Sequence, residues 1–464
     1  MTTTTTTPVD DSPGSERPPE SNRRTAIRGS IIEIGGFGLT QIIRLGGNLI
    51  LTRLLFPEAF GLAAIVSIVI SGLELLSDVG FGQSVVQNER GDEPGFLDTA
   101  WSLQVIRGFV LAGLCLLLAY PLALLYEQPI LFWLLSVSSL QSILQGFNST
   151  SLFTLRRHVR LLPIASMEIA GQVTSVLVMI LWCQFDVSVW ALIAGGFARS
   201  AVRLVGSHLL PVGYRNHFRI ERRARDQILS FGKWILGSTA IFFVSRQADR
   251  LMVGKLLGVA TLGVFSIASM LAEVIELVAS RLTNNVFFPI FSRIGKEGVG
   301  QLRRFYYRAR LPIDSVLGTG LGFLFVFGST VVEVVWDERY SEAGWMFELL
   351  CLRVAMAAVL YPCDRCLLAM GETRYPFYRS LVRAVWVLVG VPLGWYLDGT
   401  HGLVLAAALA ELPVFFVLWP PFRRLGMLRL ERELLAAGFF IAGAILGLVV
   451  DPIVSGWLHS GGIP

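Results

Sequence analysis

The sequence predicts an all-α integral membrane protein, and three observations support this class. First, 53% of the 464 residues are hydrophobic and only 16% are charged, whereas soluble domains carry about 25% charged residues. Second, the apolar residues form long runs of about 20 residues, the length that a helix needs to cross the hydrocarbon layer with its backbone hydrogen bonds satisfied. Third, only short polar gaps separate these runs. A soluble fold is therefore excluded.

The chain is divided into a polar tail, twelve core spans and at least one extra helix. Residues 1–27 hold a Thr run followed by Pro, Ser and acidic residues, a composition typical of a disordered tail. The extra helix is predicted at 434–450. The core spans lie near residues 28–52, 58–80, 98–121, 130–154, 163–183, 188–210, 229–254, 259–284, 312–335, 343–369, 377–397 and 401–422.

The distribution of Arg and Lys predicts the orientation of these spans. With the N-terminus in the cytoplasm, twenty-four basic residues fall in the cytoplasmic segments, and three (Arg53, Lys255 and Arg339) fall in the external ones. Such an excess is typical of cytoplasmic loops, and one miscounted helix would have mixed the two sets. The segment 81–98 fits least well, because it holds four acidic residues and one arginine. The same asymmetry accounts for the net charge of +5, so no nucleic-acid partner is expected.

An internal repeat predicts how the spans are grouped. A basic residue (Arg53 or Lys255), two leucines and then Gly61 or Gly263 recur at the same spacing, 202 residues apart, and Arg44 falls on Arg246 at this offset. A duplicated unit with an even number of helices gives two halves in the same orientation, related by an axis along the membrane normal. We therefore expect two six-helix lobes around a central cavity. The predicted lobes cover 28–210 and 229–422, with a basic cytoplasmic linker at 211–228 and a basic loop and extra helix at 423–464.

Ionisable side chains near the middle of the predicted spans are the candidate functional residues. They are Arg44, Arg107, Arg199, Arg246, Glu273, Arg353 and Glu411. Each would cost at least about 2.5–3.5 kcal/mol in contact with lipid, so each is expected to face a cavity or a partner. Because arginine exceeds glutamate in this set, a transported anion is one candidate for the neutralising partner.

The seventh span concentrates such residues in the run from Arg246 through Asp249 to Arg250. Arg246 and Arg250 share a helix face, and so do Glu273 and Glu276 on the next span. Guanidinium groups suit phosphate oxygens, so a diphosphate site is predicted at Arg44, Arg246, Arg250, Arg107, Arg199 and Arg353. Asp249, Glu273, Glu276 and Glu411 are expected to couple to an ion or to pair with arginines. The alternative interpretation is that all these groups form structural ion pairs, for example Arg246 with Glu273.

No pattern in the sequence indicates catalysis, a cofactor or a bound metal. The five cysteines lie in apolar segments, and the pair Cys363 and Cys366 has no second pair or histidine near it, so we interpret these cysteines as apolar filler. No nucleophile–base motif, phosphate-binding loop or long extramembrane domain is found. The sequence therefore predicts a protein that is not an enzyme.

Four motifs resemble those of the Wzx-type polysaccharide-transporter flippases, which share a superfamily with MATE exporters and lipid II flippases. The most specific is R-L-L-F-P-E-A-F-G at residues 53–61, and residues 78–87, 249–258 and 367–371 resemble three further family motifs. Some members of this family have fourteen helices, so the resemblance allows a last span near 452–464 and leaves the side of the C-terminus open.

The resemblance implies transport by alternating access in the bacterial inner membrane. The expected substrate is a polyprenyl-diphosphate-linked oligosaccharide, transferred from the cytoplasmic to the periplasmic leaflet for capsule, exopolysaccharide or O-antigen (lipopolysaccharide) synthesis. Membrane lipids are expected partners, and polysaccharide polymerase machinery is a further candidate partner.

Three other function classes fit the sequence less well. A cation-coupled, MATE-like exporter of small molecules would need mostly acidic groups inside the membrane, whereas arginine predominates here. A membrane enzyme that polymerises or ligates the glycan would be expected to carry a sizeable periplasmic loop, and the predicted external gaps are about ten residues or fewer. A structural scaffold would leave the buried arginines unexplained. The flippase interpretation is therefore favoured.

Overall fold

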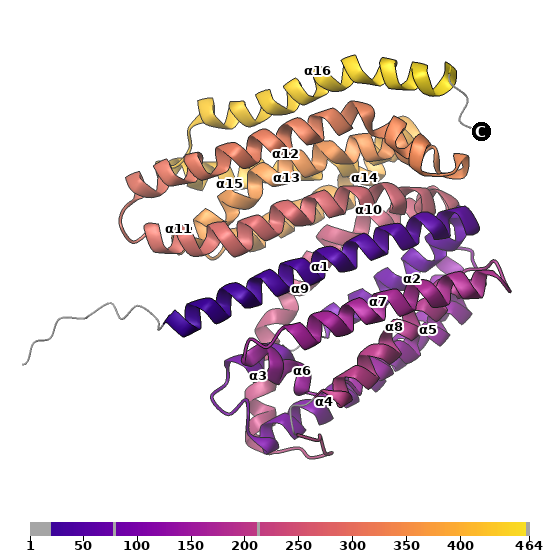
Figure 1. Cartoon of the computed structure of the whole chain (residues 1–464), viewed down its shortest axis with the longest axis vertical. Coiled ribbons are helices and arrows are strands. Elements are labelled where there is room, and N and C mark those ends of the chain that lie inside the picture. Colours follow the sequence, from indigo (N-terminus) through magenta and orange to yellow (C-terminus); the bar gives the residue numbers. More distant parts are fainter. Residues whose placement is uncertain (1–19, 78–79, 211–213, 461–464) are drawn as a thin grey trace, which may run out of the picture.

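The structure is a computed structural model and describes residues 20–77, 80–210 and 214–460. The α-helices are α1 (Glu20–Leu54), α2 (Pro57–Leu76), α3 (Phe81–Gln87), α4 (Pro94–Leu125), α5 (Ile130–Gly146), α6 (Ser151–Arg157), α7 (Leu162–Cys183), α8 (Trp190–Leu209), α9 (Arg222–Leu256), α10 (Val259–Leu282), α11 (Phe288–Ile294), α12 (Val299–Val335), α13 (Ala343–Ala369), α14 (Tyr375–Ala408), α15 (Leu412–Arg424) and α16 (Leu430–Ser460). Short helical turns follow α10 (η1, Thr283–Phe287), α12 (η2, Glu338–Tyr340) and α14 (η3, Leu409–Glu411). The long helices run side by side (Figure 1).

All thirteen predicted spans coincide with helices. Nine helical stretches of the described residues are long and apolar enough to cross a membrane, and the bent pair of α5 and α6 makes a tenth. One of the nine, Tyr375–Arg424, contains 50 residues. A straight helix of this length would measure about 75 Å, against a hydrocarbon layer of about 30 Å. The polytopic helical membrane class is confirmed, whereas membrane crossing by the charge-rich α8 and α9 stays a prediction.

The 50-residue stretch folds back on itself as a hairpin. Asp398 and Gly399 leave the helical conformation, and Gly399 has a φ of +56°. A Cβ atom on Gly394 would lie 2.3 Å from the carbonyl oxygen of Gly402, and one on Gly402 would lie 2.1 Å from that of Gly394. Only glycine permits this approach of two backbones. The two arms of the hairpin account for the spans predicted at 377–397 and 401–422.

Several boundaries differ from the predicted ones. The described part of the first helix begins at Glu20, so residues 20–27, which were assigned to the disordered tail, are helical. The predicted span 130–154 is bent by 57° between α5 and α6. The last helix, α16, continues to Ser460. Residues 452–460 therefore extend the predicted thirteenth span instead of forming a fourteenth.

Four short segments lie outside the described residues: 1–19, 78–79, 211–213 and 461–464. They contain most of the predicted tail, the first two residues of the motif at 78–87, the start of the predicted linker 211–228 and the end of the chain. The last described helix, α16, lies beside α12 and ends at the end of the bundle opposite to the start of α1 (Figure 1).

The loops that the charge pattern assigned to one side of the membrane contact one another. Arg90 forms a salt bridge with Glu221 at 2.9 Å, and Arg157 forms one with Asp92 at 3.0 Å. Arg157 also donates hydrogen bonds to the carbonyl oxygens of Val85 and Asn88. Asp92 of segment 81–98 therefore neutralises a basic residue of a neighbouring loop, and Arg90 of the same segment pairs with an acid of another loop at the same end.

A second set of loop contacts joins the segments predicted to be external. Arg339 donates to the carbonyl oxygens of Thr52 at 3.3 Å and Arg53 at 3.0 Å. The Tyr340 hydroxyl donates to the Leu55 carbonyl oxygen, and Lys255 pairs with Glu127 at 3.1 Å. The turn η2, which precedes α13, and the end of α1 come from different halves of the chain and are thus held together at this end.

Between the halves, α2 and α10 contact each other in a reciprocal way. A Cβ atom on Gly61 would lie 1.9 Å from the carbonyl oxygen of Val259, and one on Gly263 would lie 1.9 Å from that of Pro57. Both pairs are related by the 202-residue offset of the sequence repeat. Two copies of one motif that pack on each other in this way are what a pseudo-twofold axis produces, so the contact supports the predicted repeat.

Candidate functional site

Seven of the ten predicted site residues line a single cavity. The cavity has a volume of about 280 Å³ and lies among α1, α9, α10, α13 and α14. Its lining comprises Gln41, Arg44, Arg246, Gln247, Asp249, Arg250, Glu273, Glu276, Leu277, Ser280, Arg353 and Arg383. Since α1 comes from the first half of the chain and the other helices from the second, the cavity lies where the two halves meet.

Two arginines of α9 pair with two glutamates of α10 in this cavity. Arg246 donates to Glu276, and Arg250 donates to Glu273. The two helices are connected by a short turn and run antiparallel. The step from Arg246 to Arg250 towards the end of α9 therefore corresponds to the step from Glu276 to Glu273 towards the beginning of α10. The pairing of Arg246 with Glu273, which the sequence suggested as an example, is therefore wrong. The structural interpretation, by which these groups form ion pairs, holds for both arginines in this conformation.

Asp249 joins α9 to α13. Its carboxylate accepts a hydrogen bond from Nη1 of Arg353 at 3.2 Å, and both side chains are buried. Because a buried charge without a partner is strongly unfavourable, Asp249 and Arg353 stabilise each other at the contact of these two helices. Arg353 is therefore held at the cavity wall by α9.

Behind the cavity wall lies a second group of charges, centred on Glu411. This residue is 0% exposed and accepts hydrogen bonds from Arg383 and, at 3.3 Å, from Arg379. Glu411 does not line the cavity, whereas its partner Arg383 does. The hydroxyl of Tyr361 donates to Glu276 and its ring lies 4.6 Å from the Arg379 guanidinium, which connects the two groups of charges.

The predicted site residues did not include Arg383, Arg379 and Tyr361. The sequence distances of Arg383 and Glu411 from the hairpin turn could have identified Arg383. Arg383 precedes the turn at Asp398 by 15 residues, and Glu411 follows Gly399 by 12, which places both about 18–23 Å from the turn at 1.5 Å per residue. Two opposite charges at similar depth on adjacent arms are expected to pair.

Arg44 is the cavity arginine that has no acidic partner. No carboxylate of the described residues lies within 4.0 Å of its guanidinium, and its Nε is buried without a hydrogen-bond acceptor. Arg246, Arg250, Arg353 and Arg383 each pair with one acid, and those acids are Glu276, Glu273, Asp249 and Glu411. The described lining of the cavity therefore holds five arginines and three carboxylates, and among these arginines Arg44 is the one without a carboxylate partner.

Two predicted arginines lie elsewhere. Arg107 lines a separate cavity of about 340 Å³ among α2, α4, α5 and α8, where its Nε donates to Ser77 at 2.9 Å. Arg199 pairs with Glu168 at 3.2 Å, between α8 and α7. Neither α4 nor α8 borders the central cavity. The two arginines were predicted from their depth along a span, and depth does not show which helices are neighbours. The structure thus separates these two residues from the other predicted arginines.

A polytopic helical bundle with a charged cavity between its halves is the architecture of a membrane transporter. Residues 50–344 match the family described as "Polysaccharide biosynthesis protein", and the chain belongs to this family. It is similar to the lipopolysaccharide biosynthesis protein WzxC of Escherichia coli K12, with 21% identity over 81% of this chain and 75% of the relative. It is also similar to the succinoglycan biosynthesis transport protein ExoT of Rhizobium meliloti, with 25% identity over 86% and 81%.

Solved structures confirm the fold. The chain superposes on the lipid II flippase MurJ in an inward closed conformation with a TM-score of 0.68 and 11% identity, over 94% of both chains. An inward-facing multidrug resistance MATE transporter of the MOP superfamily matches with a TM-score of 0.61 and 12% identity, over 91% of this chain and all of the transporter. The expected likeness in fold to MATE exporters and lipid II flippases is therefore confirmed.

Proposed function

We propose that the protein transfers a polyprenyl-diphosphate-linked oligosaccharide across the membrane by alternating access. The observation that carries the proposal is the excess of arginines over carboxylates in the central cavity, where Arg44 has no carboxylate partner among the described residues. A diphosphate that enters the cavity exchanges its hydration for charge-assisted hydrogen bonds, each worth about 1.5–3 kcal/mol. The family of the chain and its relatives in lipopolysaccharide and succinoglycan synthesis support this substrate class.

In this proposal Arg44 makes the first contact with the diphosphate. Arg246 and Arg250 lie in the same cavity, and their pairing with Glu276 and Glu273 orients their guanidinium groups before the substrate arrives. Asp249 holds Arg353 in the same way. The carboxylates therefore act as orienting partners of the arginines, while Arg107 and Arg199 take no part in the diphosphate contact in this conformation.

The orientation of the protein in the membrane is inferred from the loop charges. The end of the bundle that carries most Arg and Lys is assigned to the cytoplasm, which places the start of α1 in the cytoplasm of a bacterium and the loop around Arg339 in the periplasm. The transferred oligosaccharide would then be available to a polysaccharide polymerase for exopolysaccharide, capsule or O-antigen assembly. The proposal requires no catalytic group and no cofactor of the chain itself.

The contacts of the cavity acids disfavour the alternative of a cation-coupled exporter of small molecules. Asp249, Glu273 and Glu276 each accept a hydrogen bond from an arginine. A cation would have to displace an arginine in order to bind one of them, whereas an anion meets Arg44 without displacing a partner. The charge balance of the site thus favours an anionic substrate.

Deletion of the gene tests the proposed function directly. The deletion strain is expected to accumulate lipid-linked oligosaccharide in the cytoplasmic leaflet and to lose the corresponding surface polysaccharide, and the wild-type gene is expected to restore both. Leaflet location can be measured by the access of an impermeant glycan-modifying reagent to intact cells and to inverted vesicles. Normal surface polysaccharide without accumulation in the deletion strain would show that the proposal is wrong.

A further inference from the structure

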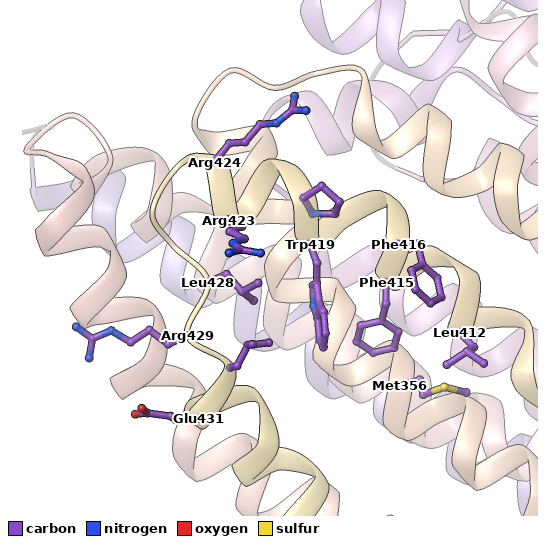
Figure 2. Close-up of a pocket in the computed structure, with 12 residues that line it drawn as sticks. Met356, Leu412, Phe415, Phe416, Trp419, Arg423, Arg424, Leu428, Arg429 and Glu431 are labelled. Atoms are coloured by element: carbon purple, nitrogen blue, oxygen red, sulfur yellow. The ribbon is translucent and has the colours of Figure 1, made fainter.

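A large groove opens on the surface of α13, α15 and the beginning of α16 (Figure 2). Its volume of about 1370 Å³ is several times that of the arginine cavity, and the two share no lining residue. The groove is lined by Met356, Leu412, Phe415, Phe416, Trp419, Pro420, Arg423, Arg424, Leu428, Arg429, Leu430 and Glu431. The proposed transport mechanism does not use any of these residues.

One wall of the groove is apolar and follows a single helix. Leu412, Phe415, Phe416 and Trp419 recur at intervals of three and four residues, which places them on one face of α15. Figure 2 shows them in a row along the helix, with Met356 of α13 beside Leu412. Phe416 is 77% exposed. A row of exposed apolar side chains of this kind suits an extended hydrocarbon chain.

The other end of the groove is basic. Arg423, Arg424 and Arg429 are exposed, and no ion pair joins their side chains to a carboxylate of the described residues. Figure 2 shows Arg423 beside Trp419 and Leu428, with Arg424 and Arg429 at the rim. Glu431 is the one acidic residue of the lining, so the groove carries two positive charges in excess.

We infer that this groove binds one anionic phospholipid of the leaflet at the basic end of the bundle. The phosphate lies among Arg423, Arg424 and Arg429, because the guanidinium fork matches phosphate oxygens and these side chains have no competing carboxylate. One acyl chain follows the row from Trp419 to Leu412. Basic pockets between membrane helices on the cytoplasmic side are suited to anionic headgroups, and tryptophan is frequent at the depth of the headgroups. The occupant is a resident membrane lipid, because the groove opens on the lipid-facing surface and is separate from the arginine cavity.

Native mass spectrometry of the purified full-length protein can test this inference. The protein is titrated with phosphatidylglycerol or with phosphatidylcholine of the same acyl chains. We expect the wild type to bind phosphatidylglycerol at least about tenfold more tightly, since each basic residue near an anionic headgroup contributes roughly a factor of five. The triple variant Arg423→Gln/Arg424→Gln/Arg429→Gln is expected to lose this preference. The variant Phe416→Asp, which places a charge in the path of the acyl chain, is expected to bind both lipids more weakly.

A matched control removes the same charge elsewhere. Arg222, Arg223 and Arg304 are exposed and do not line the groove, so the triple variant to glutamine at these positions is expected to keep the preference. Equal affinity of the wild type for both lipids, or equal loss in the control variant, would overturn the inference. It would also be overturned if a polyprenyl phosphate bound the groove and phosphatidylglycerol did not. These outcomes do not depend on transport, so they can be separated from failure of the proposed function.

Discussion

Arg44 of α1 and Arg246 of α9 line the same cavity 202 residues apart in the repeat, but only Arg246 has a carboxylate partner among the described residues. Arg246 lies opposite Glu276 of α10, whereas the neighbours of Arg44 offer no acid within 4.0 Å. Two residues that the repeat treats as equivalent therefore differ in their ion pairing. The first is available to an anion, and the second is already neutralised.

Substitution of Arg44 tests this difference. Arg44→Ala is expected to nearly abolish transfer of lipid-linked oligosaccharide in proteoliposomes, with substrate affinity lower by roughly tenfold to a hundredfold for one lost charge-assisted hydrogen bond. Arg44→Lys is expected to retain part of the activity, because it keeps the charge and loses the fork. Arg304→Ala, at an exposed position outside the cavity, serves as the control. Wild-type transfer by Arg44→Ala would contradict the assigned contact.

The pair of Arg246 and Glu276 provides a second test. Arg246→Ala leaves the buried carboxylate of Glu276 without its cationic partner, and we expect a loss of about 3 kcal/mol in the free energy of unfolding. The double variant Arg246→Ala/Glu276→Ala is expected to recover most of this stability in thermal unfolding measurements. Arg246→Ala/Glu273→Ala is not expected to recover it, because Glu276 stays unpaired.

The same double variant decides whether Arg246 also contacts the substrate. If the role of Arg246 includes the diphosphate, Arg246→Ala/Glu276→Ala is stable but transfers lipid-linked oligosaccharide poorly. Recovery of both stability and transfer would leave Arg246 with a structural role alone.

A buried ion pair attaches α16 to α12. Arg310 is 1% exposed and donates to Glu433 of α16, to Asp314 and to the hydroxyl of Tyr306. Arg310→Ala leaves two acids without their partner and is expected to lower the free energy of unfolding by about 3–5 kcal/mol. Arg308→Ala, at an exposed position of the same helix, is expected to change it by less than about 0.5 kcal/mol. Equal thermal stability of the two variants would show that the ion pair does not attach α16.

A substitution of glycine by alanine is expected to have opposite effects inside and outside the contact between α2 and α10. Gly61→Ala places a methyl group against the Val259 carbonyl oxygen and is expected to destabilise the protein, since two backbones must separate. Gly113→Ala in α4 meets no atom within 4 Å and is expected to stabilise it by about 0.5–1 kcal/mol, because alanine is the better helix residue. Thermal unfolding of both variants in detergent measures the signs, and a common sign would argue against the close contact.

Thiol labelling tests the orientation. The five natural cysteines are buried, so a membrane-impermeant reagent should leave them unmodified in intact cells. Cysteine introduced at exposed Glu338 is expected to be labelled from outside, and cysteine at Arg219 or Arg304 only after the cells are permeabilised. Labelling of Arg304→Cys in intact cells would reverse the proposed orientation.

The sequence by itself determined the class of the protein and the location of its helices. Lipid does not hydrogen-bond to backbone groups, so each crossing needs a long apolar run, and these runs were visible from residue 28 to residue 450. The loop charges predicted which of these loops contact one another at each end of the bundle. The preference of basic residues for cytoplasmic loops depends on loop composition and not on packing. The repeat of Gly61 and Gly263 was also visible, although its reciprocal contact was not.

The tertiary structure alone decided which charges meet. Arg107, Arg199 and Arg44 lie at similar depth in their spans, but depth does not specify which helices are adjacent. Of the three helices that carry them, only α1 borders the cavity. The rotation of α9 against α10 and their antiparallel direction assign Arg246 to Glu276 and Arg250 to Glu273. Side-chain packing sets that rotation through contacts between residues far apart in the chain, and for this reason the unpaired Arg44 could be recognised only in the folded protein.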